Sequence, residues 1–354
     1  MRGCKENSVP RILELGSVVA APFAAEVFAH LGFEVIKIEP PGGDPTRRDD
    51  VLGDSMFIAY NRSKKTITLD LKKPEDKRSF IELIRESDVF IENLAPGAME
   101  RLSLGKDVIL KENPSIIYCS VKGYPEGKYR NWPAFGTLAE AVSGVMWSAG
   151  NSRLPGSITD MNCALYCVVD VLWALLNKRA GYYEVTLAQS AATWLNYYLI
   201  AYQTMGKLFP GSGDRLPFWA PYELFKTYNG YIYIAIPNNN KWAKLCEVLG
   251  MKDLITDPRF ENNSNRVKNR DELHVIIENI TQKYSTEHLL ELLIASDIAA
   301  VPLMTVADLV NSDIFIWEHV NAHDKKLKVI ALPLPGPGLA NDSQDDHAAP
   351  SGAE

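Results

Sequence analysis

The sequence has few features of a secreted, membrane-spanning or metal-binding protein. Its first nine residues are mostly polar or charged, and no run of about 18 uncharged apolar residues occurs anywhere. We therefore expect a cytosolic protein that does not associate with a membrane. The five cysteines are odd in number, follow no disulfide spacing and have no neighbouring set of metal ligands. We expect plain buried thiols and no bound metal.

Several motifs of nucleotide binding and hydrolysis are missing as well. The chain has no Walker loop, no G-x-G-x-x-G and no G-x-S-x-G, which disfavours an α/β-hydrolase. Only six histidines occur, and none stands in a pattern typical of a catalytic triad. Lys and Arg number 37 against 44 Asp and Glu, so the net charge is −7 and an extended nucleic-acid surface is disfavoured. A local basic site for a phosphorylated small molecule remains compatible with this charge.

What the chain does contain is typical of a folded enzyme. Its 354 residues are 46% hydrophobic and 23% charged, which are ordinary globular proportions. At about 150 residues per domain, this length indicates two domains.

The first half predicts an α/β fold with a parallel sheet. Short runs rich in Ile and Val alternate with amphipathic segments, a pattern typical of βαβ units. The predicted strands are 11–15, 35–39, 66–71, 89–92, 116–121 and 183–187, and the main predicted helices are 20–31, 74–86, 134–149 and 161–178.

The second half predicts a small α+β domain. Asn229-Gly230 between two alternating runs predicts a hairpin with strands 222–227 and 231–236, because both turn positions of the tight hairpin type need positive φ. Thr305 and Asp308 have the spacing of a capping box. We predict a large domain over 1–210, to which 329–354 return, and a small domain over 211–328.

Asp160 is the carboxylate with the clearest catalytic potential. It directly precedes the apolar helix predicted over 161–178. Two interpretations are open: an ordinary helix N-cap, which Asp favours, or a reactive carboxylate kept ionised at the positive end of the helix. In the second case, free backbone N–H groups there could also hold a developing oxyanion.

Five segments together identify a family. They are 18–47, 61–72, 88–102, 158–176 and 220–236. In this order and spacing, they resemble the class III CoA-transferases, the superfamily of formyl-CoA and carnitine CoA-transferases and of α-methylacyl-CoA racemase. The resemblance implies a large Rossmann-like domain that binds CoA, a smaller domain that closes over the acyl group, and an interlocked homodimer.

The resemblance also implies roles for particular residues. The family's catalytic Asp falls on Asp160. Its CoA-contacting positions fall on Val18, Val19, Ala20, Arg47, Asn61, Lys64, Asn93 and Arg101. The cations in this set agree with the chemistry, because a protein of net negative charge must present local cations to the phosphates of CoA.

The chain departs from the family pattern at two points. Gly136 follows Phe135 where many members have a carboxylate, so Glu140, one helical turn further on, becomes a second catalytic candidate. The racemase branch has a His at the position of Phe135 and a Glu near Pro237, and both are absent here.

The leading hypothesis is therefore an enzyme that transfers CoA from an acyl-CoA donor to a carboxylic acid. CoA serves as a substrate, and Asp160 forms first an acyl anhydride and then a CoA thioester. The alternatives are an acyl-CoA racemase or epimerase, and a CoA-binding homologue without catalysis. The sequence does not identify the acyl groups.

Overall fold

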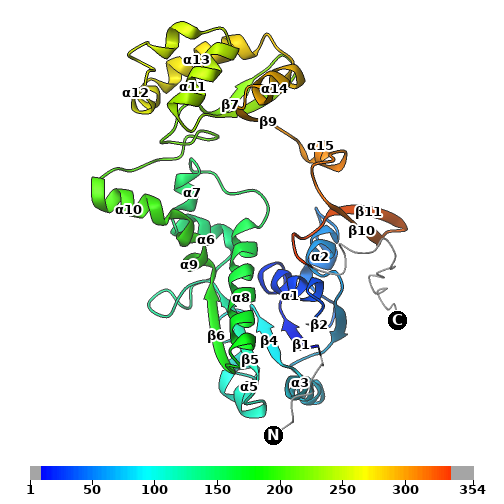
Figure 1. Ribbon diagram of the computed structural model, residues 1–354. Helices are drawn as coiled ribbons and strands as arrows, with labels where there is room; N and C mark the ends of the chain where they lie inside the picture. The colour runs from blue at the N-terminus through cyan, green and yellow to red at the C-terminus, as the bar shows by residue number, and fades with distance from the viewer. Residues whose placement is uncertain (1–8, 336–354) are drawn as a thin grey trace. The chain divides into compact units, whose positions relative to one another are not determined.

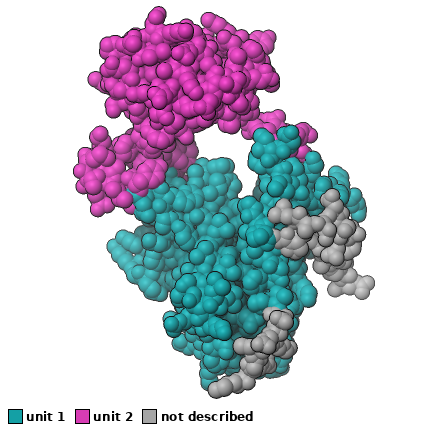
Figure 2. Space-filling model, viewed as in Figure 1, with its two compact units in different colours: residues 1–145, 153–196, 313–354 teal, residues 146–152, 197–312 magenta. Residues whose placement is uncertain are grey.

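The computed structural model describes residues 9–335, and the chain divides into two compact units. Among the described residues, the first contains 9–145, 153–196 and 313–335, and the second contains 146–152 and 197–312 (Figure 2). The division after residue 196 lies fourteen positions before the predicted limit at 210. The short stretch 146–152, which the sequence places within the large domain, belongs to the second unit.

A parallel sheet of six strands forms the centre of the first unit (Figure 1). Its order is β3-β2-β1-β4-β5-β6, and every neighbouring pair is parallel. The predicted α/β class is thus confirmed, with the strand order of Rossmann domains. The strands are β1 (Arg11–Leu15), β2 (Glu34–Glu39), β3 (Lys65–Thr68), β4 (Val89–Glu92), β5 (Ile117–Lys122) and β6 (Gly181–Thr186).

Helices cover both faces of this sheet, because its central strands are apolar on both sides. On one face, α1 (Ala20–His30) and α8 (Ile158–Leu176) enclose a core that includes Val89, Ile91 and Cys119. On the other, α3 (Pro74–Glu86) and α5 (Lys106–Glu112) lie over a second core. Shorter elements of this unit are η1 (Pro45–Arg48), α2 (Ser55–Tyr60), α4 (Ala98–Arg101), α6 (Gly136–Val142) and α9 (Leu187–Ala192).

Helix α8 is long and apolar enough to cross a membrane by length and composition alone. Its buried residues, among them Cys163, Cys167 and Val171, pack instead into the core of the first unit. Of its apolar stretch, 39% is buried in this way.

A C-terminal hairpin, which the sequence analysis did not predict, completes the first unit. Strands β10 (Trp317–Ala322) and β11 (Lys325–Ile330) pair through a turn at His323 and Asp324, whose φ values are 52° and 56°. Glu318 of this hairpin accepts hydrogen bonds from Arg62, at 3.0 Å, and from His30 of α1, at 3.4 Å. The hairpin is therefore joined to the first unit across more than 250 residues of sequence.

The second unit is α+β, with its own apolar core. Strands β7 (Tyr222–Lys226), β8 (Tyr231–Ala235) and β9 (Ala299–Pro302) form an antiparallel sheet. Its other elements are α11 (Asn239–Val248), η3 (Lys252–Ile255), α12 (Asn263–Lys268), α13 (Arg270–Thr281), α14 (Thr286–Ala295) and α15 (Val306–Val310). Helix α7 (Val145–Ser148), η2 (Thr193–Leu195) and α10 (Asn196–Met205) lie at or beside the division between the units.

The predicted hairpin is present, but its turn differs from the predicted type. Lys226 pairs with Tyr231, and the four-residue loop between them has no positive φ at Asn229 or Gly230. The side-chain oxygen of Asn229 instead accepts hydrogen bonds from the backbone N–H and the hydroxyl of Thr286. The Asn therefore anchors the loop to α14. The capping box of Thr305 and Asp308 forms as predicted.

Candidate active site

A strained turn joins β1 to α1 at the carboxyl edge of the sheet. Val18 has φ 66°, a left-handed conformation that is a genuine outlier for a β-branched residue. Val19 is the N-cap of α1, and Ala20 is its first residue. Chain connections leave β1 and β4 in opposite directions across the sheet, so this turn lies at the topological switch point where Rossmann folds bind ligands.

Asn93 fixes this turn from the neighbouring strand. Its Oδ1 accepts the N–H of Ser17 at 3.0 Å, and its Nδ2 donates to the carbonyl of Ser17 at 2.9 Å. Gly16 allows Asn93 and α1 to approach the turn closely. A Cβ at position 16 would lie 2.6 Å from the Cβ of Ala21 and 2.9 Å from Oδ1 of Asn93. Two of the predicted sites, the 18–20 turn and Asn93, are thus brought together.

The two predicted arginines lie in different surroundings. Arg47, in η1, donates to both carboxylate oxygens of Glu39 at 2.8 and 2.9 Å, and its guanidinium lies 3.6 Å from the ring centre of Phe57. Arg101 is exposed at the end of α4 and makes one long hydrogen bond, of 3.4 Å, to the carbonyl of Pro96. Arg101 is the freer of these two cations to meet a phosphate.

Lys64 differs from its expected place as a ligand-facing cation. Its side chain is 1% exposed, and Nζ bonds the carboxylate of Glu14 at 2.8 Å and Oδ1 of Asn61 at 2.9 Å. Asn61 is itself buried and donates to the carbonyl of Phe57. These side chains lie beneath the surface, so direct contact with a phosphate needs a rearrangement.

Asp160 lies within the first turn of α8, three positions further into the helix than predicted. The N-cap is Ser157, and Asp160 is the third helical residue, so the interpretation of Asp160 as an N-cap is wrong. Burial raises the pKa of Asp160 to about 6, and the negative charge of Glu140 adds to the effect. The carboxylate is mostly ionised at neutral pH, yet poorly solvated, which suits a nucleophile.

Glu140 and Gly136 of α6 border this carboxylate. Glu140 is 2% exposed, and it accepts hydrogen bonds from the Leu154 N–H at 3.0 Å and from the Thr159 hydroxyl at 3.2 Å. A Cβ on Gly136 would lie 2.0 Å from Oδ2 of Asp160. Because glycine has no side chain, position 136 leaves room for the carboxylate of Asp160.

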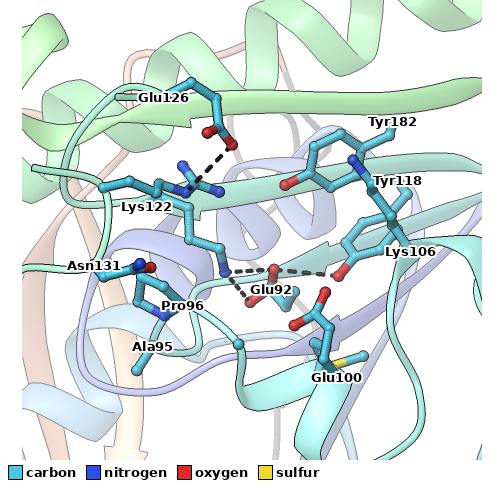
Figure 3. Close-up of a pocket in the computed structure, with 13 residues that line it drawn as sticks. Glu92, Ala95, Pro96, Glu100, Lys106, Tyr118, Lys122, Glu126, Asn131 and Tyr182 are labelled. Atoms are coloured by element: carbon cyan, nitrogen blue, oxygen red, sulfur yellow. Dashed lines mark hydrogen bonds and ion pairs between the residues drawn. The ribbon is translucent and has the colours of Figure 1, made fainter. Parts of the chain in front are cut away.

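A polar cavity of about 270 Å³ lies at the carboxyl ends of β4 and β5, and sequence reasoning missed it (Figure 3). Among the residues that line this cavity, Lys122 donates to the two carboxylate oxygens of Glu92, at 2.7 and 2.9 Å. Nζ of Lys106 lies 5.2 Å from the ring centre of Tyr182. The last residue of each strand was the available signal, since strand ends at this edge are where ligands bind. Pro96 lines the cavity and also bonds Arg101, so the cavity adjoins a predicted CoA contact.

No group of three or more potential metal-ligating side chains occurs among residues 9–335. The four cysteines in that range, Cys119, Cys163, Cys167 and Cys246, are free and buried.

A model of CoA-transferase family III matches residues 10–346. The chain belongs to this family. It is 30% identical to the acetyl-CoA:oxalate CoA-transferase of Acetobacter aceti, over 95% of this chain and 89% of that one. It is 32% identical to the β subunit of a succinyl-CoA–L-malate CoA-transferase of Chloroflexus aurantiacus, over 92% of this chain and 83% of that one.

Solved structures of similar chains have the same fold. A CaiB/BaiF family protein of Brucella suis is 30% identical and superposes with a TM-score of 0.77, over 86% of this chain and 85% of that one. A Mycobacterium tuberculosis protein is 28% identical with a TM-score of 0.81, over 92% and 91%. The resemblance seen in the sequence is confirmed, and the chain is a CoA-transferase of family III for which CoA is a substrate.

Proposed function

We propose that the enzyme transfers CoA from an acyl-CoA to a carboxylic acid through covalent intermediates on Asp160. The observation that carries the proposal is the carboxylate itself, poorly solvated in the first turn of α8 and accommodated by a glycine. A carboxylate nucleophile divides one difficult exchange into easier steps.

The proposed steps balance without water or any further reactant. A carboxylate oxygen of Asp160 attacks the donor thioester carbon, the C–S bond breaks, and CoA thiolate leaves an aspartyl acyl anhydride. The thiolate then attacks the Asp160 carbonyl, releasing the donor acid and forming an aspartyl-CoA thioester. The acceptor carboxylate displaces CoA from this thioester, and the thiolate finally attacks the acceptor acyl carbon, which restores Asp160.

The CoA site in this proposal is formed by the 18–20 turn, Asn93, Arg47 and Arg101. The backbone of the turn faces the carboxyl edge of the sheet, where ligands bind in this fold, and the two arginines supply the charge that phosphates need.

We propose short dicarboxylic acids as the first acceptors to examine. The two relatives described above are named for oxalate and malate, and both of these are dicarboxylic acids. We also propose that the enzyme is a cytosolic homodimer.

The test combines kinetics with trapping of the intermediate. Acetyl-CoA and succinyl-CoA are offered with oxalate, malate or glutarate, and new CoA esters are read by mass spectrometry. Asp160→Asn keeps the shape of the side chain but not its charge, and we expect transfer to fall by at least about 10³-fold. In the wild type, hydroxylamine added with donor should leave a mass shift on the peptide that contains Asp160.

Asp170→Asn is the matched control, because Asp170 lies on the same helix and is also half-buried. Transfer that survives in Asp160→Asn and falls in Asp170→Asn would contradict the assignment. Exchange of the α-proton of an acyl-CoA in deuterated water, without acceptor, would indicate a racemase instead. CoA binding without trapping or transfer would indicate a binding protein.

A further inference from the structure

A buried cluster of charges underlies the 18–20 turn and has no role in the proposed steps. Glu14, on β1, is fully buried, and so are the side chains of the two lysines beside it, Lys37 at 0% and Lys64 at 1% exposure. Lys37 Nζ lies 2.8 Å from its Oε1, and Lys64 Nζ lies 2.8 Å from its Oε2. A buried ion pair need not stabilise the fold, because removing its charges from water is costly. The hydrogen bonds that these lysines make to the surrounding backbone indicate their role more directly.

Lys37 connects two segments of the proposed CoA site. Its Nζ donates to the carbonyl of Gly16 at 2.9 Å, at the start of the strained turn. It also lies 3.1 Å from the carboxylate of Asp44. Asp44 is the N-cap of η1, the short helix that carries Arg47.

Lys64 connects the remaining segments. Its Nζ donates to the carbonyl of Pro22, in the first turn of α1, at 2.7 Å, and to the carbonyl of Tyr60 at 3.0 Å. Its contact with Oδ1 of Asn61 adds the end of α2 to the same cluster. Glu14 thus joins the residues before the turn, the residues after it, and two neighbouring segments.

We propose that Glu14, Lys37 and Lys64 are positioning residues that hold the CoA site in its binding conformation. This inference rests on the proposed function. Val18 stays left-handed only where its surroundings determine the backbone more strongly than its own preference does. Hydrogen bonds to Gly16 and Pro22, on either side of the turn, provide that restraint together with Asn93.

The charges of the cluster balance, which explains how it remains buried. Two ammonium groups face the carboxylates of Glu14 and Asp44. Burial alone would raise the pKa of Glu14, but the two lysines outweigh it and hold the pKa below its ordinary value. The carboxylate therefore stays ionised and keeps both lysines in place.

Lys37→Met tests this role, since it keeps the length of the side chain and removes the ammonium group. We expect the KM for acyl-CoA to rise about tenfold or more while kcat stays within about threefold, because binding alone is weakened. Amide hydrogen exchange in the peptide containing residues 16–22 should become faster, which reports the turn independently of activity.

Ile84→Ala is the matched control. Ile84 is fully buried in the core beneath α3, so this variant is destabilised without touching the charge cluster. An equal rise in KM in the control, or an unchanged KM and unchanged exchange in Lys37→Met, would overturn the proposal. If Lys37→Met does not fold, the double variant Glu14→Gln/Lys37→Met removes opposite charges together and is measured in the same way.

The two proposals fail differently. A wild-type enzyme that binds CoA but shows no trapped intermediate contradicts the nucleophile and leaves the exchange measurement valid. A wild-type enzyme with full activity, whose Lys37→Met variant keeps its KM and its exchange rates, contradicts the positioning role alone.

Discussion

At the scale of single residues, the environment of Asp160 predicts a pH dependence of the rate. The proposed nucleophile must be ionised to react, and burial raises the pKa of Asp160 to about 6 with a contribution from Glu140. We expect kcat to fall below about pH 6, as protonation removes the reactive form. Glu140→Gln removes one negative charge nearby, so the acidic limb should move to lower pH. A pH–rate profile of both proteins from pH 5 to 9 checks this, and an identical limb in the two would contradict it.

The same burial predicts that Asp160→Asn stabilises the fold. The folded-state pKa, about 6, lies above the ordinary 3.8, so the folded protein holds the proton more tightly than the unfolded chain. Ionised Asp160 therefore costs stability above pH 6, and this cost disappears below pH 3.8. We expect the variant to gain about 1–3 kcal/mol in its free energy of unfolding at pH 7.5. Urea unfolding at pH 7.5 and pH 4 should show the gain only at the higher pH.

Gly136 provides a steric test of the same site. The Cβ that Gly136→Ala introduces would lie 2.0 Å from Oδ2 of Asp160, so the carboxylate must move. Because a displacement of about 1 Å can cost on the order of 100-fold in rate, we expect kcat to fall by about that factor. The ordinary backbone conformation at 136 leaves the fold intact, which circular dichroism can confirm. A kcat equal to that of the wild type would show that Asp160 has room to spare.

The sequence indicates candidate residues for this site, but it does not indicate their surroundings. Asp160 is recognisable from its place before an apolar helix and from the family pattern. The burial of Lys64 is not, because a lysine in a loop reads as a surface cation until its four acceptors are placed around it.

At the scale of elements, the β1–α1 turn predicts an unusual response to glycine. Val18 has φ 66° and is 38% exposed, so Val18→Gly removes backbone strain and little packing. We expect the free energy of unfolding to rise by up to about 1 kcal/mol, after subtraction of the entropy cost of glycine. Val19→Gly is the control, since Val19 is 2% exposed with an ordinary φ of −130° and should lose about 2 kcal/mol. Equal losses in the two variants would contradict the strain.

Elements with strong local signals are predicted well, and elements fixed by distant contacts are not. The parallel strands follow from their apolar runs, and β7 and β8 from their alternation. The β10–β11 hairpin has no Asn-Gly or Asp-Gly turn, and its docking depends on Arg62 and His30, far away in the sequence. The predicted type of turn at Asn229 is wrong. The Asn229 side chain accepts a hydrogen bond from the backbone of Thr286 in α14, a contact with a distant part of the sequence.

At the scale of the whole molecule, an apolar stripe on α8 predicts association. Exposed side chains recur every three or four residues along it, and their exposed fractions range from 46% to 84%. They are Leu165, Val169, Trp173 and Leu176. Contiguous exposed apolar surface marks interaction sites, and the proposed homodimer supplies a partner for it.

Val169→Glu should therefore weaken the dimer, because it buries a charge in the interface. We expect sedimentation at micromolar concentration to shift from twice the chain mass toward a single chain. Val275→Glu, at a similarly exposed position on α13, is the control and should leave the mass unchanged. A wild-type protein that sediments as a monomer would refute the dimer.

The division into units differs in position from the predicted domain limit. A Pro- and Gly-rich stretch at 210–214 gave a plausible boundary in the sequence. That residues 146–152 belong to the second unit depends on packing rather than on composition. A Cβ on Gly211 would lie 2.1 Å from the backbone nitrogen of Gly150, an approach that composition does not reveal.

The return of the chain to the first unit also affects the timing of its synthesis. Arg62 leaves the ribosome 256 residues before Glu318, its partner in the hairpin. At about 5–20 residues per second, that interval lasts roughly 13 to 50 seconds. Throughout it, the surface around His30 and Arg62 lacks the strands that finally cover it. The first unit therefore lacks its C-terminal hairpin for as long as the second unit is being synthesised.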